Sequence, residues 1–182
     1  MKEHETGKDR EYEHSVETDY RVEEARPKYL KNPEKKQGEV YSVIRKFIEE
    51  NGGKCLPFYA PVDVRLDCDD KTMVQPDVLI LCDESKRTKR YIMGAPDFCL
   101  EILSKSTRRK DCIKKLQKYT DAGVKEYWII DPYTKTLLVY HWKDDYTPHM
   151  YPLEGKVGLA LYDERLSIDL NAIADLIVDD KS

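Results

Sequence analysis

Two carboxylates interrupt stretches of the sequence that are otherwise apolar. Asp77 precedes the run Val78 to Leu81, and Glu101 lies between Leu100 and Ile102. Burial of a carboxylate without compensation is costly, so each acid needs a partner or a metal ion. Two carboxylates on neighbouring strands, together with a backbone carbonyl and water, match the ligands that Mg²⁺ prefers. The alternative from the acids alone is structural, namely a buried salt bridge or a carboxylate that accepts backbone hydrogen bonds.

A basic segment follows the second acid. It carries seven basic residues and a single acid, Asp111, which gives a local charge of +6 in a chain whose net charge is −4. Such a concentration of positive charge suits contact with a phosphate backbone, and the alternative is an ordinary solvated helix face. The basic residues are Lys105, Arg108, Arg109, Lys110, Lys114, Lys115 and Lys118.

One lysine of this segment has an informative position. Cys112, Leu116 and Tyr119 fall on one face of the expected helix, and Asp111 and Lys115 are i, i+4 neighbours at the edge of that face. A lysine at the edge of a buried face can extend its ammonium group beside the adjacent strand. The alternative is a surface Asp–Lys pair that contributes only a few tenths of a kcal/mol.

Several common kinds of site have no signature in the sequence. It contains no G-x-G-x-x-G, G-x-x-x-x-G-K-[ST], H-E-x-x-H or G-x-S-x-G, so nothing indicates a dinucleotide, a nucleoside triphosphate or an acyl-enzyme. The five cysteines stand singly without C-x-x-C, and the four histidines include no H-x-x-x-H pair. We therefore expect neither a disulfide framework nor a zinc site.

The composition fits one soluble domain with a polar leading segment. The chain has 182 residues, of which 40% are hydrophobic and 36% charged, enough apolar residues for a core. No apolar run approaches the roughly 18 residues of a membrane helix, and the N-terminus lacks the apolar stretch of a secretory signal. We therefore expect a cytoplasmic protein without a membrane segment. Residues 1–37 contain 19 charged residues, so we expect this segment to be partly disordered and residues 38–182 to form the domain.

The hydrophobic pattern predicts an α/β fold (α+β with a mixed sheet) in which helices flank the sheet. Apolar residues at helical spacing begin at Val40, and this helix ends at Asn51-Gly52-Gly53. The third strand, the second helix and the fourth strand form a crossover, which demands a parallel pair, whereas the earlier strands can pair antiparallel. The expected strands are 55–66, 74–81, 98–103, 126–130 and 137–142, the second helix is 107–122, and a hairpin over 159–168 and a helix over 171–177 close the chain.

Four segments of the chain combine into a pattern of specific order and spacing. They are Gln75-Pro76-Asp77-Val78, Gly94 to Ser104, Asp111 with Lys115 and Tyr119, and Gly123 to Pro132. Together they resemble the Uma-type putative restriction endonuclease family of the PD-(D/E)XK nuclease superfamily, over roughly residues 39–142. The resemblance implies a restriction-endonuclease-like core and metal-dependent hydrolysis of phosphodiester bonds. Its implied partner is nucleic acid, with DNA as the expected substrate, and a homodimer would suit the cutting of both strands.

The resemblance also implies roles for single residues. Asp77 matches the aspartate of the superfamily's PD motif and Glu101 its second acid, and together they would hold Mg²⁺ or Mn²⁺. The superfamily's lysine would follow Glu101 by two residues, where this chain has Leu103; in this family the role is assigned to the next helix, at Lys115. Structural or supporting roles are expected for Asp97 and Asp111, and contacts with flanking phosphates for Arg108, Arg109 and Lys110.

The chain departs from the family pattern ahead of the first helix. Family members commonly have Glu-Leu-x-x-Gly and Ser-x-x-His-Gln there, whereas this chain reads Arg26 to Pro33 and then Lys36-Gln37-Gly38-Glu39. The candidates for the superfamily's additional acid are therefore Glu24 and Glu39. A second possible function is that of a catalytically inactive nuclease-like fold that binds nucleic acid or a protein without cutting. A third is that of a purely structural domain in which the acids are incidental.

Overall fold

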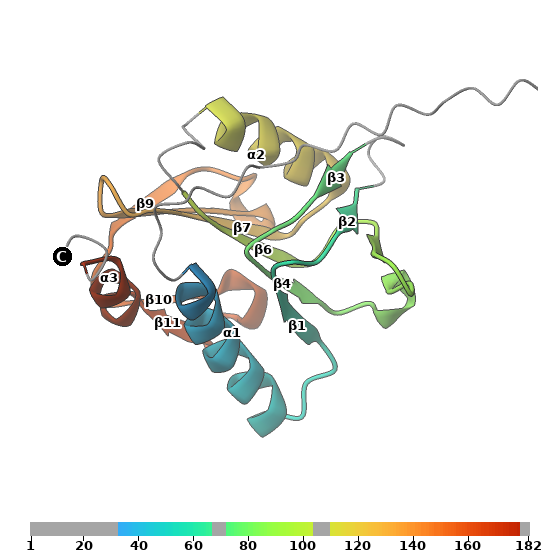
Figure 1. Cartoon of the computed structure of the whole chain (residues 1–182), viewed down its shortest axis with the longest axis horizontal. Coiled ribbons are helices and arrows are strands. Elements are labelled where there is room, and N and C mark those ends of the chain that lie inside the picture. The colour runs from blue at the N-terminus through green and yellow to red at the C-terminus, as the bar shows by residue number, and fades with distance from the viewer. Residues whose placement is uncertain (1–32, 67–71, 104–109, 179–182) are drawn as a thin grey trace, which may run out of the picture.

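A six-stranded mixed sheet forms the centre of the protein. The computed structural model describes residues 33–66, 72–103 and 110–178, with side chains over 37–66, 72–103 and 114–175. The strand order is β1-β4-β6-β7-β8-β9 (Figure 1), and within this sheet only β6 and β7 pair in parallel. The bounds are β1 (Leu56–Tyr59), β4 (Val78–Leu81), β6 (Phe98–Ile102), β7 (Glu126–Asp131), β8 (Thr136–His141) and β9 (His149–Pro152).

The parallel pair is formed by a crossover through helix α2 (Lys110–Ala122). Gly123 ends this helix in the left-handed region at φ 87°, where a residue without Cβ is favoured. Phe98 then lies beside Glu126, and the register continues to Ile102 beside Ile130. The predicted crossover, the mixed sheet and the antiparallel pairing of the earlier strands are therefore confirmed.

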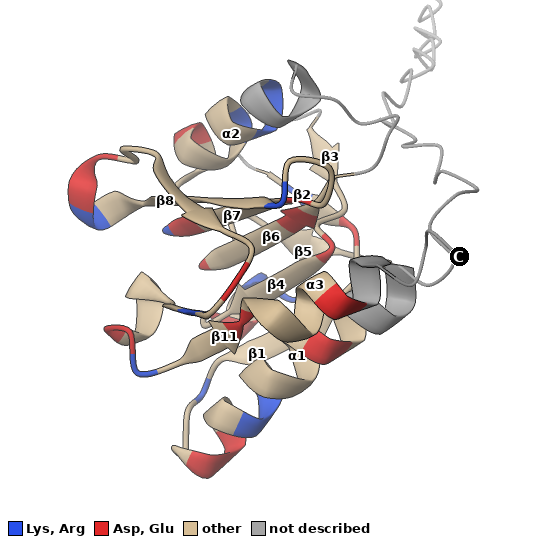
Figure 2. Ribbon diagram, turned by 90° about the vertical axis from the view of Figure 1, so that its left-hand side faces the viewer, with Lys and Arg blue, Asp and Glu red and all other residues tan. Residues whose placement is uncertain are grey.

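Helices cover both faces of the sheet. Helices α1 (Pro33–Glu50) and α3 (Leu170–Val178) lie on one side and α2 on the other (Figures 1 and 2). Alternate residues of the central strands point to the two sides, because side chains alternate along a strand. The core on the α1 side includes Val78, Ile80, Phe98, Leu100 and Trp128, and that on the α2 side includes Leu79, Leu81, Cys99, Tyr127 and Ile129. In the described part of the chain, no helix combines the length and the apolar character needed to cross a membrane.

Helix α1 buries the predicted apolar stripe. Val40, Ile44 and Ile48 are all buried against the sheet. The helix ends as expected, since the Asn51 N–H donates to the Phe47 carbonyl at 3.1 Å and Gly52 adopts a φ of 62°. Its first residue is Pro33, so residues 33–37, which were assigned to the polar leading segment, are helical; residues 1–32 of that segment lie outside the described residues.

Two segments predicted as single strands are each divided between two sheets. The stretch 55–66 forms β1 and β2 (Val64–Arg65), and 74–81 forms part of β3 (Met73–Val74) and then β4. Strands β2 and β3 leave the central sheet and form a second sheet with β5 (Ile92–Met93), in the order β3-β2-β5. Pro61 and Pro76 stand at the two divisions, where a residue without an N–H cannot continue the ladder.

The C-terminal part of the sheet differs from the expected hairpin. Strand β9 was not predicted, because His149–Pro152 shows no alternation of apolar and polar residues. The hairpin itself consists of β10 (Lys156–Gly158) and β11 (Ser167–Asp169), paired antiparallel. Among the described residues, three short 3₁₀ helices connect strands: η1 (Glu84–Lys86), η2 (Trp142–Asp144) and η3 (Ala160–Tyr162).

A buried carboxylate joins the sheet to η3. Glu126, the first residue of β7, is 0% exposed. Its Oε1 accepts hydrogen bonds from the Trp128 indole N–H at 2.7 Å and the Ala160 N–H at 3.1 Å, and its Oε2 accepts from the Leu161 N–H at 2.8 Å. Burial raises the pKa of Glu126, while these hydrogen bonds act in the opposite direction. The carboxylate therefore has a structural role as the shared acceptor of three donors.

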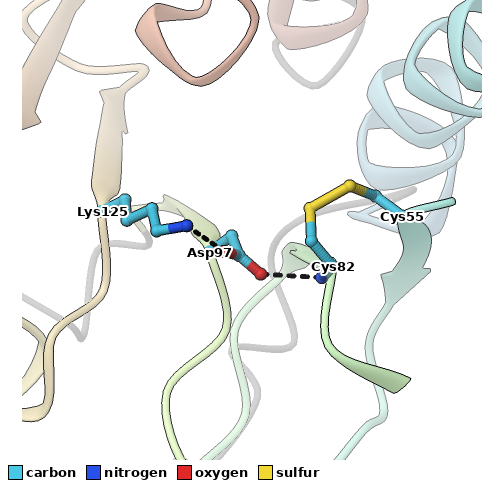
Figure 3. Close-up of a disulfide and its surroundings, with 4 residues drawn as sticks. All are labelled: Cys55, Cys82, Asp97 and Lys125. Carbon is cyan, nitrogen blue, oxygen red and sulfur yellow. Dashed lines mark hydrogen bonds and ion pairs between the residues drawn. A yellow bond between two sulfur atoms is a disulfide. The ribbon is translucent and has the colours of Figure 1, made fainter. Parts of the chain in front are cut away.

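A disulfide links two neighbouring strands. Cys55 and Cys82 are bonded (Figure 3), one residue beyond the Leu56–Leu81 pair of β1 and β4. No disulfide framework was expected from the sequence, and the bond between Cys55 and Cys82 corrects that expectation. They are separated by 27 residues in sequence, so only the strand register brings them together.

Candidate active site

The two acids singled out in the sequence lie at the same end of adjacent strands. Val78 of β4 pairs with Leu100 of β6 in antiparallel register, and one further step places Asp77 opposite Glu101. The Ile102 N–H donates to the Asp77 Oδ2 at 2.7 Å, which fixes the aspartate against the end of β6. Directly opposed residues of antiparallel strands point to one face, with Cβ atoms about 4.5–5.5 Å apart. The register therefore places Asp77 and Glu101 side by side at this end of β4 and β6.

Glu101 is contacted by two side chains of α2. Its Oε1 accepts from the Lys115 Nζ at 3.1 Å and from the Tyr119 hydroxyl at 3.0 Å. Lys115 and Tyr119 are four residues apart and therefore lie on one helix face. The Glu101 and Lys115 side chains are only 8% and 16% exposed, so this ion pair is sheltered from water. Of the two alternatives for Lys115, the structure supports the one in which its ammonium lies beside the third predicted strand.

Tyr119 acts as a fixed donor to Glu101. It is fully buried, and burial together with the nearby Glu101 charge raises the pKa of its hydroxyl well above the usual value. The hydroxyl therefore stays protonated at neutral pH and donates to the carboxylate. This contact limits the directions in which Glu101 can present its oxygens.

The α1 residue that reaches Asp77 is Gln37. Its side-chain Nε2 donates to the Asp77 Oδ1, and the residue is only 7% exposed. Sequence reasoning missed this residue, although a signal was present. Gln37 precedes Val40 by three positions and Ile44 by seven, so it continues the buried stripe of α1. A polar residue on such a stripe needs a buried partner.

The other candidate residues are placed less centrally or not at all. Glu39 is exposed, two residues and about 200° around the helix from Gln37, so the structure does not bring it to the acids. Leu103, at the position of the superfamily's lysine, packs against the apolar core on the α2 side. The lysine that contacts Glu101 is Lys115 of α2. Glu24, Arg108 and Arg109 lie outside the described residues, as do the side chains of Lys110 and Asp111.

Asp97 lies at the opposite end of β6 from Glu101. Its Oδ2 accepts from the Cys82 N–H at 2.7 Å and its Oδ1 is 2.8 Å from the Lys125 Nζ (Figure 3). The Asp97 carbonyl accepts from the Lys125 and Glu126 N–H groups, each at 3.1 Å. These contacts join β4, β6 and the start of β7. Of the two roles considered for Asp97, they support the structural one.

The replacement of Asp97 by alanine is expected to lower the free energy of unfolding by about 1–3 kcal/mol, because the Cys82 N–H loses its acceptor. Urea unfolding measures this change. Lys125→Ala is the matched control: the Lys125 side chain is 49% exposed, so loss of this ion pair is expected to cost at most about 1 kcal/mol. An Asp97→Ala protein that unfolds at the same urea concentration as the unaltered protein would contradict this structural role.

The architecture identifies the class of fold, and comparison with known proteins identifies the family. A mixed sheet with one parallel crossover, flanked by helices and carrying two acids at adjacent strand ends, is a restriction-endonuclease-like core. The chain belongs to the Uma2 family, described as "Putative restriction endonuclease", whose pattern matches residues 9–167. This match confirms the family resemblance found in the sequence.

A solved structure shows the same fold. It is the crystal structure of a putative nuclease belonging to DUF820 from Anabaena variabilis ATCC 29413, with a TM-score of 0.63 and 19% sequence identity. The similarity covers 78% of this chain and 79% of that chain. No protein among the curated sequences matched.

Proposed function

We propose that the protein is a divalent-metal-dependent endonuclease that hydrolyses phosphodiester bonds of DNA, with Asp77, Glu101 and Lys115 as its catalytic residues. The observation that carries this proposal is the contact between Lys115 and Glu101 at 3.1 Å, beside a register that sets Asp77 opposite Glu101. Three chemically matched side chains thus come from three separate elements. Membership of the Uma2 family supports the same activity.

The donor set of the site fits Mg²⁺ or Mn²⁺. Asp77 and Glu101 would hold the ion, because hard cations of this size prefer carboxylate oxygens and usually keep several waters. A cation bound there would polarise the scissile phosphate and lower the pKa of a coordinated water. The two carboxylates and one ammonium carry a formal charge of −1, so the site attracts a cation before it accepts an anionic substrate.

The chain's own residues have separate tasks in this proposal. The Lys115 ammonium supplies a positive charge for a phosphate oxygen on which negative charge develops during the reaction. Tyr119 orients Glu101 through its hydroxyl, and Gln37 orients Asp77 through its amide. Arg108, Arg109 and Lys110 precede or begin α2, and we assign them to phosphates that flank the cleavage site.

The metal dependence of DNA cleavage tests the proposal. Purified protein is incubated with supercoiled plasmid and linear duplex DNA in EDTA, in Mg²⁺ and in Mn²⁺. We expect nicked or linear product with either cation and none in EDTA, and no product from Asp77→Asn. Light scattering of the same samples measures whether the active species is a homodimer. Cleavage that persists in EDTA, or in Asp77→Asn at the rate of the unaltered protein, would contradict the assignment.

One observation favours the second function, a nuclease-like fold that binds without cutting. At the position where α1 reaches Asp77 the chain has the neutral amide of Gln37, whereas Glu39 is exposed. With fewer carboxylates, the site would hold a cation more weakly. This function predicts salt-dependent DNA binding without turnover and a melting temperature that Mg²⁺ leaves unchanged. The same plasmid assay, combined with thermal melting, separates the two functions.

A further inference from the structure

Three metal-ligating side chains meet at the other end of the sheet from Asp77 and Glu101. They are His141 at the end of β8, Asp144 in η2 and His149 at the start of β9, and their ligand atoms all lie within 4.8 Å of one another. His141 pairs with Glu126 of β7, whereas Glu101 pairs with Ile129. Along the strand direction the two groups are therefore offset by three residues of β7, or roughly 10 Å, and they lie on strands on either side of β7.

The pairing of β8 and β9 sets the geometry of this cluster. His149 lies opposite Val139, and His141 follows Val139 by two residues, so the two imidazoles share one face of the sheet. Their rings are stacked, with centroids 5.4 Å apart and planes at 10°. The turn between them is anchored to the body, since the Tyr146 hydroxyl donates to the Val124 carbonyl at 2.8 Å and the Tyr146 N–H to the His141 carbonyl at 3.0 Å.

Two buried atoms of the cluster have no hydrogen bond. The His141 Nδ1 and the Asp144 Oδ1 are 3.1 Å apart, yet neither takes part in a hydrogen bond with any group that the structure describes. The second carboxylate oxygen of Asp144 contacts the His149 Nε2. A buried polar atom without a hydrogen bond is costly, and a cation that bound both atoms would remove this cost.

We propose that His141, Asp144 and His149 form a binding site for a late first-row divalent cation, with Zn²⁺ as the expected ion. Ligands about 2.0–2.1 Å from a tetrahedral ion lie roughly 3.3 Å from one another, close to the separation of the two buried atoms. Two imidazoles and one carboxylate suit Zn²⁺ rather than Mg²⁺, which prefers oxygen ligands alone. The site is thus chemically distinct from the one proposed for Asp77 and Glu101.

The cluster lies near the surface of the protein. The side chains of His141, Asp144 and His149 are 20%, 27% and 42% exposed, so water can complete the coordination. Because β9 is the edge strand of the sheet, an ion held by these residues would join β8, η2 and β9 and hold that edge in place. The expectation of no zinc site rested on the absence of an H-x-x-x-H pair, and that pattern does not test for ligands that strand pairing brings together.

Titration of the full-length chain with Zn²⁺, after removal of bound metal with a chelator, tests the proposal. Calorimetry is expected to show that the chain binds one Zn²⁺ ion at this cluster. The affinity of the His141→Asn/His149→Asn double variant for Zn²⁺ is expected to be weaker by about 100-fold or more. Free Zn²⁺ at 100 times its Kd is expected to raise the melting temperature by about 5–10 °C. Absence of this shift in the double variant is part of the same prediction.

Matched variants identify the ligands. Asp144→Asn is expected to weaken binding, whereas Asp145→Asn, its exposed neighbour, and His4→Ala/His14→Ala are expected to bind as the unaltered chain does. Asp77→Asn is also expected to keep full Zn²⁺ binding, which separates this site from the nuclease site. Circular dichroism without metal checks that each variant is folded. The proposal is overturned if the chain binds no Zn²⁺, or if the folded double variant binds it with unchanged affinity and stoichiometry.

Discussion

Replacement of Lys115 by methionine is expected to lower the rate of DNA cleavage by about 100-fold or more, while the Kd for DNA changes only a few-fold. The ammonium acts on charge that develops in the transition state, so its removal affects turnover rather than ground-state binding. Methionine keeps most of the length and apolar contact of the lysine stem. Single-turnover cleavage at saturating protein measures the chemical step, and fluorescence anisotropy measures binding.

Lys114→Met is the matched control for this prediction. Lys114 is the neighbouring residue of α2 but is exposed, so we expect its variant to cleave at the unaltered rate and to bind DNA slightly less tightly at low salt. Loss of Lys115 also removes a sheltered partner of Glu101, so thermal melting must show that both variants are folded. Equal cleavage rates for the two variants would remove Lys115 from the catalytic residues.

Replacement of Glu126 by alanine is expected to lower the free energy of unfolding by about 3 kcal/mol or more. The change leaves three buried donors without their acceptor, namely the Trp128 indole N–H and the N–H groups of Ala160 and Leu161. Each such donor costs about 1–3 kcal/mol when water cannot replace the acceptor. Urea unfolding, followed by both tryptophan fluorescence and circular dichroism, measures the loss. A change below about 1 kcal/mol would show that water reaches these donors.

The pH dependence of stability tests the state of the same carboxyl group. Burial raises the pKa of Glu126 above its ordinary value of 4.5, so the folded protein binds the proton more tightly than the unfolded chain does. The resulting stabilisation is present in full below the unfolded pKa and is lost as pH rises through the folded pKa. The unaltered protein is therefore expected to lose stability relative to Glu126→Gln over that range. A difference that stays constant with pH would contradict the raised pKa.

Local features of the sequence were sufficient to predict the core that carries the candidate site. The apolar stripe from Val40, the glycine that ends α2 and the apolar strand around Glu101 all depend on residues close together in the chain. Such signals act through helical periodicity, strand alternation and turn conformation, which a single segment expresses by itself. These patterns singled out Asp77, Glu101 and Lys115, since each departs from or borders such a pattern, whereas the catalytic roles proposed for them came from the family resemblance.

Long-range pairing decided the features that the sequence did not predict. Gln37 meets Asp77 across 40 residues, Cys55 meets Cys82 through the β1–β4 register, and His141 meets His149 because β9 joins β8. In each case the partners have no fixed spacing that a motif could record. Which side chains become neighbours depends on the register and order of the strands, and these follow from the burial of two apolar faces by the whole chain rather than from any one segment.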